Sequence, residues 1–459
     1  MASKKRGRTW RKRKKRTRER DSRPVCQGKD KELINLQQFM KANDFTGCPL
    51  KPAIFPGTGR GVMAVRSIKA GEVIIAVPRK ILISCRTVLS SRLGIELKKW
   101  SITSRFTCAQ VLSLFLLLEK NKGAASFWHP YIRSLPNTFT TPVYFTETEL
   151  NALSPSLQDK ARDLKKELLH AYNDLEPFVA SSLPELDSKF TFDAFRWAWS
   201  VLKTRTLYQE DCKSPYLSKK EPQTSTLVPM LDLINHSPSA KARFGYNVNT
   251  SCYEVRVLEP YRKYDQVFIS YGFEENTELM LKFGFYVPRN PKDFIKINLS
   301  ELFECLPQIS DDERKNKVDL LFDSGLLSNQ TCTWNGISWQ VMSVLQVLAS
   351  NDIDKNSVPS MFPKSNPLLE LCQFQIARYM MPFRNAALST EEVRALQAAR
   401  TVLERRLKSY ETTIEEDELL LSEVQSPCME MAVGSRVEEK RMLLHALKLL
   451  TQDKPINSY

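Results

Sequence analysis

The apolar positions divide the chain into β-like and helical stretches. Short runs at 62–65 and 73–77 are rich in valine and isoleucine, and Gly71 lies in the turn between them. Runs of this kind bounded by turn residues are typical of strands, so we expect an early β-hairpin here. From about residue 87 to 201 the apolar residues recur at helical spacing instead. The helices expected in this region cover 109–118, 150–175 and 192–202.

The pattern changes twice more along the chain. After a polar loop at about 214–226, a continuous apolar run at 227–234 predicts a buried strand. Two further short strands are expected at 253–257 and 267–269. Beyond Pro288 and Pro291 the spacing is helical to the end, with helices expected at 338–348, 368–380, 391–410 and 437–450. We expect the acidic run Glu415–Glu418 on a solvated face or in a loop.

Composition places the chain among globular proteins without a membrane-spanning helix. With 459 residues, of which 42% are hydrophobic and 26% charged, the chain is long enough to bury a large core. Its longest strongly apolar stretch, at 111–118, is eight residues long, whereas a helix that crosses a bilayer needs about 20. The N-terminus lacks the apolar core of a secretory signal peptide. We therefore expect the protein to stay inside the cell.

Positive charge is concentrated at the N-terminus. The net charge is +15, and residues 1–23 hold 13 Lys and Arg against Glu19 and Asp21, which leaves only +4 for the rest. Such a segment cannot offset its ordering entropy by burying apolar surface, so we expect residues 1–30 to be a disordered basic tail. Two functions suit it: a nuclear-import signal, or an arm that contacts nucleic acid non-specifically through phosphates. A merely solubilising tail is the third interpretation.

Neither the cysteines nor the histidines predict a metal site. The ten cysteines are scattered without any CxxC pair, which favours free and mostly buried thiols over a zinc site or a disulfide framework. Only four histidines occur, and none lies at ligand spacing from another. We therefore expect no metal.

Three segments contain residues that suit a binding site. Gly57–Gly61 lacks the Lys-Ser/Thr of a P-loop and precedes a strand, so its glycines predict a sharp turn or a close approach of a ligand. Asn235 and His236 end a buried apolar run, where polar side chains often face a pocket. Tyr271 follows an apolar strand and precedes a glycine. Taken alone, each segment is better explained by a turn or by core packing.

In combination, the three segments resemble the SET-domain methyltransferases. The elements G-R-G, D-x-x-N-H and S-Y-G occur in the order of that family, at 59–61, 232–236 and 270–272. The helical region that splits the β part, the lack of cysteine-rich zinc segments and the helical C-terminal part are similar to one class, the Rubisco large-subunit lysine methyltransferases. The resemblance covers the chain from about residue 43 to its end.

The resemblance implies an α+β fold and an enzymatic function. A SET domain at 31–287 would be split by a helical insertion at about 95–225, and an all-α substrate-binding domain of the Rubisco-methyltransferase type would cover 288–459. It implies S-adenosyl-L-methionine as cofactor and a lysine of a histone or another protein as substrate. The alternative is a catalytically silent SET-fold protein that binds a peptide or chromatin. We expect a monomer in nucleus and cytosol, without membrane contact.

The functional residues of the family carry over onto matching positions of this chain. Tyr271 would be catalytic, because its hydroxyl would orient the lysine amine and the methyl group. Arg205 would lie near the carboxylate of the cofactor, whereas Thr206 occupies a position that varies with substrate. The positions expected to contact the cofactor, besides Tyr271 and Arg205, are Gly59, Arg60, Gly61, Met63, Arg92, Leu93, Gly94, Asp232, Asn235, His236, Phe283, Gly284 and Phe285. Of these, Phe283–Phe285 would form an aromatic wall shared by cofactor and lysine.

Overall fold

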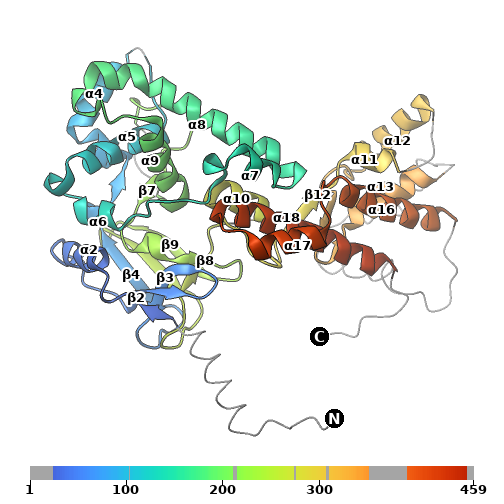
Figure 1. Ribbon diagram of the computed structural model, residues 1–459, viewed down its shortest axis with the longest axis horizontal. Coiled ribbons are helices and arrows are strands. Elements are labelled where there is room, and N and C mark those ends of the chain that lie inside the picture. Colours follow the sequence, from blue (N-terminus) through green and yellow to red (C-terminus); the bar gives the residue numbers. More distant parts are fainter. Residues whose placement is uncertain are drawn as a thin grey trace, which may run out of the picture. The chain divides into compact units, whose positions relative to one another are not determined.

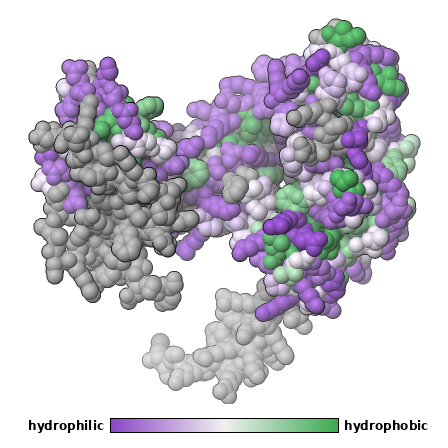
Figure 2. Space-filling view, turned by 180° about the vertical axis from the view of Figure 1, so that it is seen from behind, coloured by the Kyte–Doolittle hydropathy of each residue, from purple (hydrophilic) through white to green (hydrophobic). Residues whose placement is uncertain are grey.

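The chain forms two compact units. A computed structural model describes residues 24–102, 104–209, 214–272, 275–305, 310–350 and 390–451 (Figure 1). Unit 1 comprises Met1–Phe139 and Asp163–Phe273, and unit 2 comprises Thr140–Arg162 and Glu274–Tyr459. Within the described ranges, no helix is long and apolar enough to span a membrane. On the face seen in Figure 2, hydrophobic residues form small patches between hydrophilic ones.

Small sheets form the β part of unit 1. The first sheet is antiparallel and contains β1 (Val25–Cys26), β2 (Leu50–Phe55) and β3 (Gly59–Ala64). The second has the order β4 (Val73–Pro78), β10 (Cys252–Val257) and β9 (Ala242–Asn247). The third has the order β5 (Ile83–Ser84), β7 (Ser225–Leu227) and β6 (Thr206–Tyr208). A parallel pair, β8 (Asn235–His236) and β11 (Phe268–Ile269), completes the set within the described residues.

The basic tail is shorter than predicted. Residues 1–23 lie outside the described residues, so the disorder expected there stays a prediction. β1, however, pairs with β2, and Asp30 caps helix α2 (Lys31–Lys41) by accepting hydrogen bonds from backbone N–H groups of its first turn. Paired backbone and a capped helix are ordered structure, so a disordered tail cannot extend to residue 30.

The early hairpin predicted from the sequence does not form. β3 pairs with β2, and β4 pairs instead with β10, which lies far later in the chain. Gly71, whose φ is +83°, turns the backbone before β4 and donates its N–H to the Val257 carbonyl at 2.8 Å. The turn therefore leads β4 into a different sheet. β-branched content identifies strand residues, but it does not identify their partners.

The apolar run at 227–234 is not a single strand. β7 ends at Leu227, a 3₁₀ turn η5 (Leu231–Leu233) follows, and β8 begins at Asn235. Pro229 has no N–H for a ladder, and Met230 adopts a left-handed conformation with φ of +69°, which interrupts extended backbone. The apolar side chains of the run are nevertheless buried.

Helices form the second layer of unit 1, as the apolar spacing predicts. α5 (Cys108–Asn121) begins at a capping box in which Thr107 and Gln110 bond to each other's backbone. This helix is buried along most of its length and packs against α9 (Phe192–Arg205), which explains its apolar run. In Figure 1, α4 (Arg92–Trp100), α5 and α9 lie together on one side of the strands of unit 1, beside part of α8 (Pro155–Ser182).

The cysteines differ from the prediction. Cys85 and Cys108 form a disulfide, with their Cα atoms 6.4 Å apart, a separation that this bond can span. Of the other described cysteines, only Cys332 is buried. The pairing depends on the packing of α3 (Cys85–Leu89) against α5, which the spacing of cysteines along the chain does not reveal.

Unit 2 is mostly helical. Its larger core combines β12 (Phe294–Lys296), β13 (Thr331–Thr333) and β14 (Gly336–Ile337) with α11 (Leu299–Phe303), α12 (Asp311–Asp323), α13 (Trp339–Ala349), α16 (Thr390–Lys408) and α18 (Pro427–Thr451). α13, α16 and α18 confirm three predicted helices, whereas the helix predicted at 368–380 lies outside the described residues. The three short strands correct the prediction of an all-α domain.

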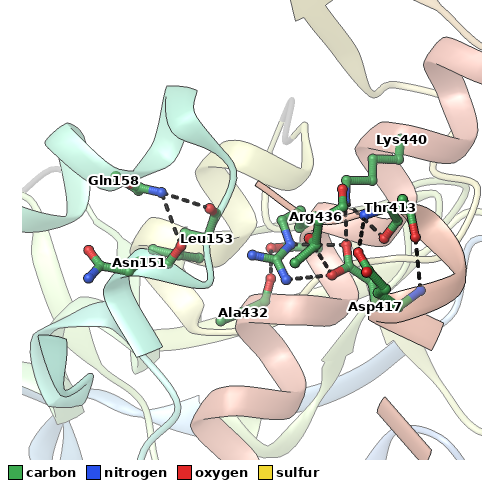
Figure 3. A network of polar contacts seen from close by, with 11 residues as sticks. Asn151, Leu153, Gln158, Thr413, Asp417, Ala432, Arg436 and Lys440 are labelled. Carbon is green, nitrogen blue, oxygen red and sulfur yellow. Dashed lines mark hydrogen bonds and ion pairs between the residues drawn. The ribbon is translucent and has the colours of Figure 1, made fainter. Parts of the chain in front are cut away.

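A buried ion cluster corrects the prediction for the acidic run. Asp417, on α17 (Ile414–Glu423), is fully buried. It accepts hydrogen bonds from Arg436 Nε at 3.0 Å and Lys440 Nζ at 2.7 Å (Figure 3). The Thr412 Oγ1 hydroxyl donates to the same carboxylate at 2.7 Å. The carboxylate therefore joins α17 to α18, which carries both cations, while the acids on either side of Asp417 remain exposed.

Candidate functional site

Two parallel strands bring the predicted segments of unit 1 together. β8 and β11 pair so that Asn235 lies opposite Phe268. The residue before β11, Val267, donates its N–H to the Val62 carbonyl of β3 at 3.0 Å. The glycine-rich turn, the Asn-His pair and the segment that leads to Tyr271 are therefore neighbours, although they are distant in the sequence.

Asn235 connects β8 to the glycine-rich turn. Its Nδ2 donates to the carbonyl oxygens of Thr58 at 3.3 Å and Arg60 at 3.1 Å. A Cβ atom on Gly61 would lie 2.7 Å from Asn235 Nδ2 and 2.7 Å from Gln266 Nε2. Any side chain at this position would displace both amides, so the glycine is required for a close approach. The close neighbours of Gly61 in the structure are these amide side chains, and the close approach of a ligand expected from the sequence stays a prediction.

His236 is held in one tautomer by the residue that follows β11. The Tyr271 backbone N–H donates to His236 Nδ1 at 3.0 Å, so Nδ1 is an acceptor and the proton of the neutral ring is on Nε2. The two rings lie with centroids 5.2 Å apart at 52°. The family motif thus produces a direct contact between its second and third elements.

The Tyr271 hydroxyl donates to the Ile234 carbonyl at 2.8 Å. Burial raises the pKa of this hydroxyl to about 12, with Arg205 lowering it and Asp232 raising it further. Tyr271 is therefore a neutral hydroxyl at physiological pH and cannot act as a base. Because the hydroxyl donates its single proton to the Ile234 carbonyl, its oxygen can only act as an acceptor toward an additional polar neighbour.

Arg205, Asp232 and Tyr131 form a buried polar cluster next to these residues. Arg205, at the end of α9, donates from Nη1 to the Asp232 carbonyl at 2.9 Å and to its Oδ2 at 3.3 Å. Tyr131, on α6 (His129–Ser134), donates its hydroxyl to the same Oδ2 at 3.0 Å. Asp232 Oδ1 is buried and has no hydrogen-bond partner among the described residues.

The charges of this cluster influence one another. Burial raises the pKa of the Asp232 carboxyl, while Arg205, Tyr131 and Arg60 oppose the rise. Burial also lowers the pKa of Arg60, an effect that Arg205 reinforces and Asp232 counteracts. Two guanidinium groups thus flank one buried carboxylate. The two guanidinium groups outnumber the carboxylate, so the site is locally positive and suits a ligand that carries a carboxylate. Asp232 Oδ1 remains as a hydrogen-bond acceptor.

Arg92, Leu93 and Gly94 are placed elsewhere in unit 1. They form the first turn of α4, where Arg92 makes an ion pair with Glu185 at 3.3 Å. A Cβ on Gly94 would lie 2.3 Å from the Leu89 carbonyl oxygen, so this glycine is needed for the packing of α3 against α4. These contacts give the segment a structural role, and its expected contact with the cofactor stays a prediction.

The remaining predicted residues are Met63 and the aromatic wall. Met63 is buried on β3 against Ala53. Phe283 and Phe285 belong to unit 2, where their ring centroids are 6.2 Å apart. Gly284, with φ of +75°, ends helix α10 (Asn276–Phe283) in a left-handed C-cap. Their place beside cofactor and lysine stays a prediction.

Sequence reasoning missed two residues of the site. Tyr131 lies in the helical insertion, 101 positions before Asp232, and no motif marks it. Gln266 accepts from the Thr58 hydroxyl at 2.8 Å, and its Nε2 is buried without a partner among the described residues. Its position one residue ahead of an apolar strand is the only signal in the sequence. As for metals, the described residues contain no cluster of His, Cys, Asp or Glu suited to bind one.

Comparisons with known proteins identify the family of this chain. The chain matches the family model of the SET domain over residues 59–272 and that of the Rubisco LSMT substrate-binding domain over residues 309–443. SET domain-containing protein 4 of Mus musculus is 36% identical over 347 residues, which cover 75% of this chain and 78% of the relative. The protein of the same name from Homo sapiens is 35% identical and covers 72% of this chain and 74% of the relative.

More distant relatives and solved structures extend the match. Actin-histidine N-methyltransferase of Xenopus tropicalis is 27% identical, covering 95% of this chain and 72% of the relative. The crystal structure of the SET domain of LSMT bound to lysine and AdoHcy has a TM-score of 0.60 at 21% identity, covering 91% of this chain and 90% of that one. Rubisco LSMT bound to AdoMet has a TM-score of 0.59 at 21% identity, covering 91% of both chains. This chain therefore belongs to the SET-domain methyltransferase family, in the class that carries a Rubisco LSMT substrate-binding domain.

Proposed function

We propose that this protein is an S-adenosylmethionine-dependent protein-lysine N-methyltransferase that acts on histone or non-histone lysines. One observation carries the proposal: the glycine-rich turn, Asn235, His236 and Tyr271 meet at one place in unit 1 through direct hydrogen bonds. Relatives supply the second support, because LSMT structures have been solved with AdoMet, AdoHcy and lysine.

The residues present fit the cofactor. Its amino-acid end carries a carboxylate and an ammonium group, and the site offers the Arg205 guanidinium and the buried Asp232 Oδ1, which has no partner among the described residues. Its adenosine end is polar, and Gln266 Nε2 and the Asn235 amide lie against Gly61. S-adenosylmethionine supplies a methyl group bonded to a sulfonium, which an amine can attack directly.

The chain's contribution to such a transfer is positioning. A lysine ε-amine has a pKa near 10.4 in water, and burial in a site of this kind favours its neutral, nucleophilic form. The Tyr271 oxygen, whose proton is donated to Ile234, accepts from the incoming N–H and so fixes the direction of the nitrogen lone pair. Alignment of the two reacting atoms replaces a bimolecular encounter.

A histidine acceptor is the second candidate. It is favoured by the similarity to actin-histidine N-methyltransferase, which covers 95% of this chain. A histidine ring nitrogen is already neutral in much of the population near pH 7, so it needs less desolvation than a lysine. The third candidate is the silent peptide-binding protein, which has the same fold and transfers no methyl group.

Identification of the methylated residue distinguishes these candidates. The full chain is incubated with methyl-labelled S-adenosylmethionine, purified histones and a cell extract, and the labelled peptides are sequenced by mass spectrometry. We expect the label on lysine. Label on histidine alone would replace the proposal by the second candidate, and no label above that of a sample without the protein would leave the silent protein.

The basic tail supports a proposal about location. We propose that residues 1–23 direct the protein to the nucleus, in addition to a cytosolic pool, because 13 of these residues are Lys or Arg. Contact with nucleic acid phosphates is the alternative role of the same residues. The substrate-binding domain supports a protein substrate, and we propose that the chain acts as a monomer.

A further inference from the structure

Tyr131 links the helical insertion to the charged end of the site. Its side chain is fully buried, and its hydroxyl is 3.0 Å from Asp232 Oδ2. Burial and the neighbouring carboxylate raise the pKa of Tyr131 well above its usual value, so the hydroxyl keeps its proton and donates it. A donor with one proton and one charged acceptor makes a fixed contact.

The contact determines how Asp232 presents its two oxygens. Both Tyr131 and Arg205 bond to Oδ2, which leaves Oδ1 buried and without a partner among the described residues. Without the tyrosine proton, the carboxylate would be able to rotate and exchange its oxygens. The Arg205 guanidinium, which also bonds to Oδ2, would then no longer have a carboxylate oxygen in a fixed position.

Arg205 depends on Asp232 for its orientation. In the described structure its hydrogen bonds all come from Nη1, to the Asp232 carbonyl and to Oδ2. A guanidinium has five N–H donors in a rigid fork, so the fixed Nη1 determines the direction in which the other donors point. Tyr131 therefore acts on Arg205 through Asp232, without any contact of its own to the cofactor.

We propose that Tyr131 is a positioning residue for the amino-acid end of S-adenosylmethionine, which it controls through Asp232 and Arg205. The inference rests on the proposed cofactor and extends it to a residue of the insertion. It assigns to the insertion, through α6, an indirect part in cofactor binding besides its packing role.

The test compares two ligands that differ only at the amino-acid end, whose binding Tyr131 is proposed to control. S-adenosylhomocysteine contains the amino-acid end, whereas 5′-methylthioadenosine lacks it. Calorimetry on the full chain should show that Tyr131→Phe weakens S-adenosylhomocysteine about tenfold, as expected for one hydrogen bond to a charged group, and leaves 5′-methylthioadenosine within about twofold. Tyr172→Phe is the matched control, since that hydroxyl donates to the Phe190 carbonyl at 3.2 Å, also within unit 1. It should change neither affinity.

A second variant separates positioning from folding. Asp232→Asn removes the charge through which Tyr131 acts and which faces the ammonium group of the cofactor, so it should cause a selective loss at least as large, and Tyr131→Phe should add little in that background. Equal weakening of both ligands, or a lower melting temperature with an unchanged affinity ratio, would overturn the positioning role. If the wild type binds neither ligand, the proposed function itself fails, which is a distinguishable result.

Discussion

At the scale of single residues, Asn235 is the most informative position for cofactor binding. Its amide bonds two carbonyls of the glycine-rich turn, so Asn235→Ala frees that turn and leaves both carbonyls without this donor. We expect a loss of about 1 to 3 kcal/mol in S-adenosylmethionine affinity, measured by calorimetry. Asn121→Ala is the control, because Asn121 Nδ2 also donates to a backbone carbonyl, that of Glu185, but in the helical layer. Equal affinity in the two variants would contradict the role of Asn235.

Single residues also show how far sequence reasoning reaches. Asn235, His236 and Tyr271 were identified from short motifs, because the polar residue types themselves are the signal. Tyr131 was not identified, because a buried tyrosine in a helix is ordinary core by its pattern. Only its distance to Asp232 reveals it, and that distance depends on the fold.

At the scale of elements, the fit between β3, β8 and β11 depends on one missing side chain. Gly61→Ala would place a Cβ 2.7 Å from the side-chain amide nitrogens of Asn235 and Gln266, so both amides must move away from β3. We expect a lower melting temperature and weaker S-adenosylmethionine binding. Gly245→Ala on β9 is the matched control, since nothing lies within 4 Å of its added Cβ, and alanine is favoured over glycine in a strand. A Gly61→Ala protein with normal binding would show that the close approach is unnecessary.

The α17–α18 pair provides a prediction about stability and pH. Burial alone would raise the pKa of Asp417, but hydrogen bonds from Arg436, Lys440 and Thr412 hold it below its usual value. A carboxyl with a depressed pKa in the folded state stabilises above its unfolded pKa, near 3.9, and this contribution is lost as pH falls through the lower folded value. Asp417→Asn should therefore cost about 3 to 5 kcal/mol near pH 7 and progressively less in acid.

Thermal unfolding between pH 3 and 7 measures this effect. Glu418→Gln is the control, because Glu418 and its partner Arg441 are about half exposed, and exposed pairs contribute at most about 1 kcal/mol. If the neighbouring substitution destabilises as much as Asp417→Asn, burial of the ion cluster is not the cause. From the sequence, all four acids were expected on a solvated face or in a loop, because a run of like charges does not show which member faces the core.

Element pairing is where the sequence was least informative. The residues of β3 and β4 were recognised as strands, yet their partners are β2 and β10. The local residue content indicates which segments can form strands, whereas the pairing of strands depends on burial against segments far away in the chain. The break at Pro229 and Met230 was missed for a related reason: the run is continuously apolar, and periodicity cannot distinguish a strand from a buried turn.

At the scale of the whole molecule, we expect the basic tail to be separable from the part of the chain that binds the cofactor. Deletion of residues 1–23 removes a charge of +11 of the total +15, and none of the site residues predicted from the sequence lies in that segment. We expect the tagged variant to shift toward the cytoplasm in fluorescence images, with methyl transfer to a short peptide unchanged. An unchanged nuclear fraction would refute the import function, and salt-dependent loss of nucleic acid binding would then support the alternative.

The central claim is that Tyr271 and its neighbours position an amine for methyl transfer from S-adenosylmethionine. The turnover rate of the Tyr271→Phe variant tests this claim most directly. The substitution keeps the ring and removes an oxygen that acts mainly in the transition state, so turnover should fall on the order of 100-fold while cofactor affinity changes little. Tyr253→Phe is the control, because that buried hydroxyl donates to the Tyr208 carbonyl at 2.7 Å. Turnover, cofactor dissociation constant and melting temperature are measured on the same preparations. The account predicts a selective loss of turnover in Tyr271→Phe alone, and normal turnover in a folded Tyr271→Phe protein would contradict it.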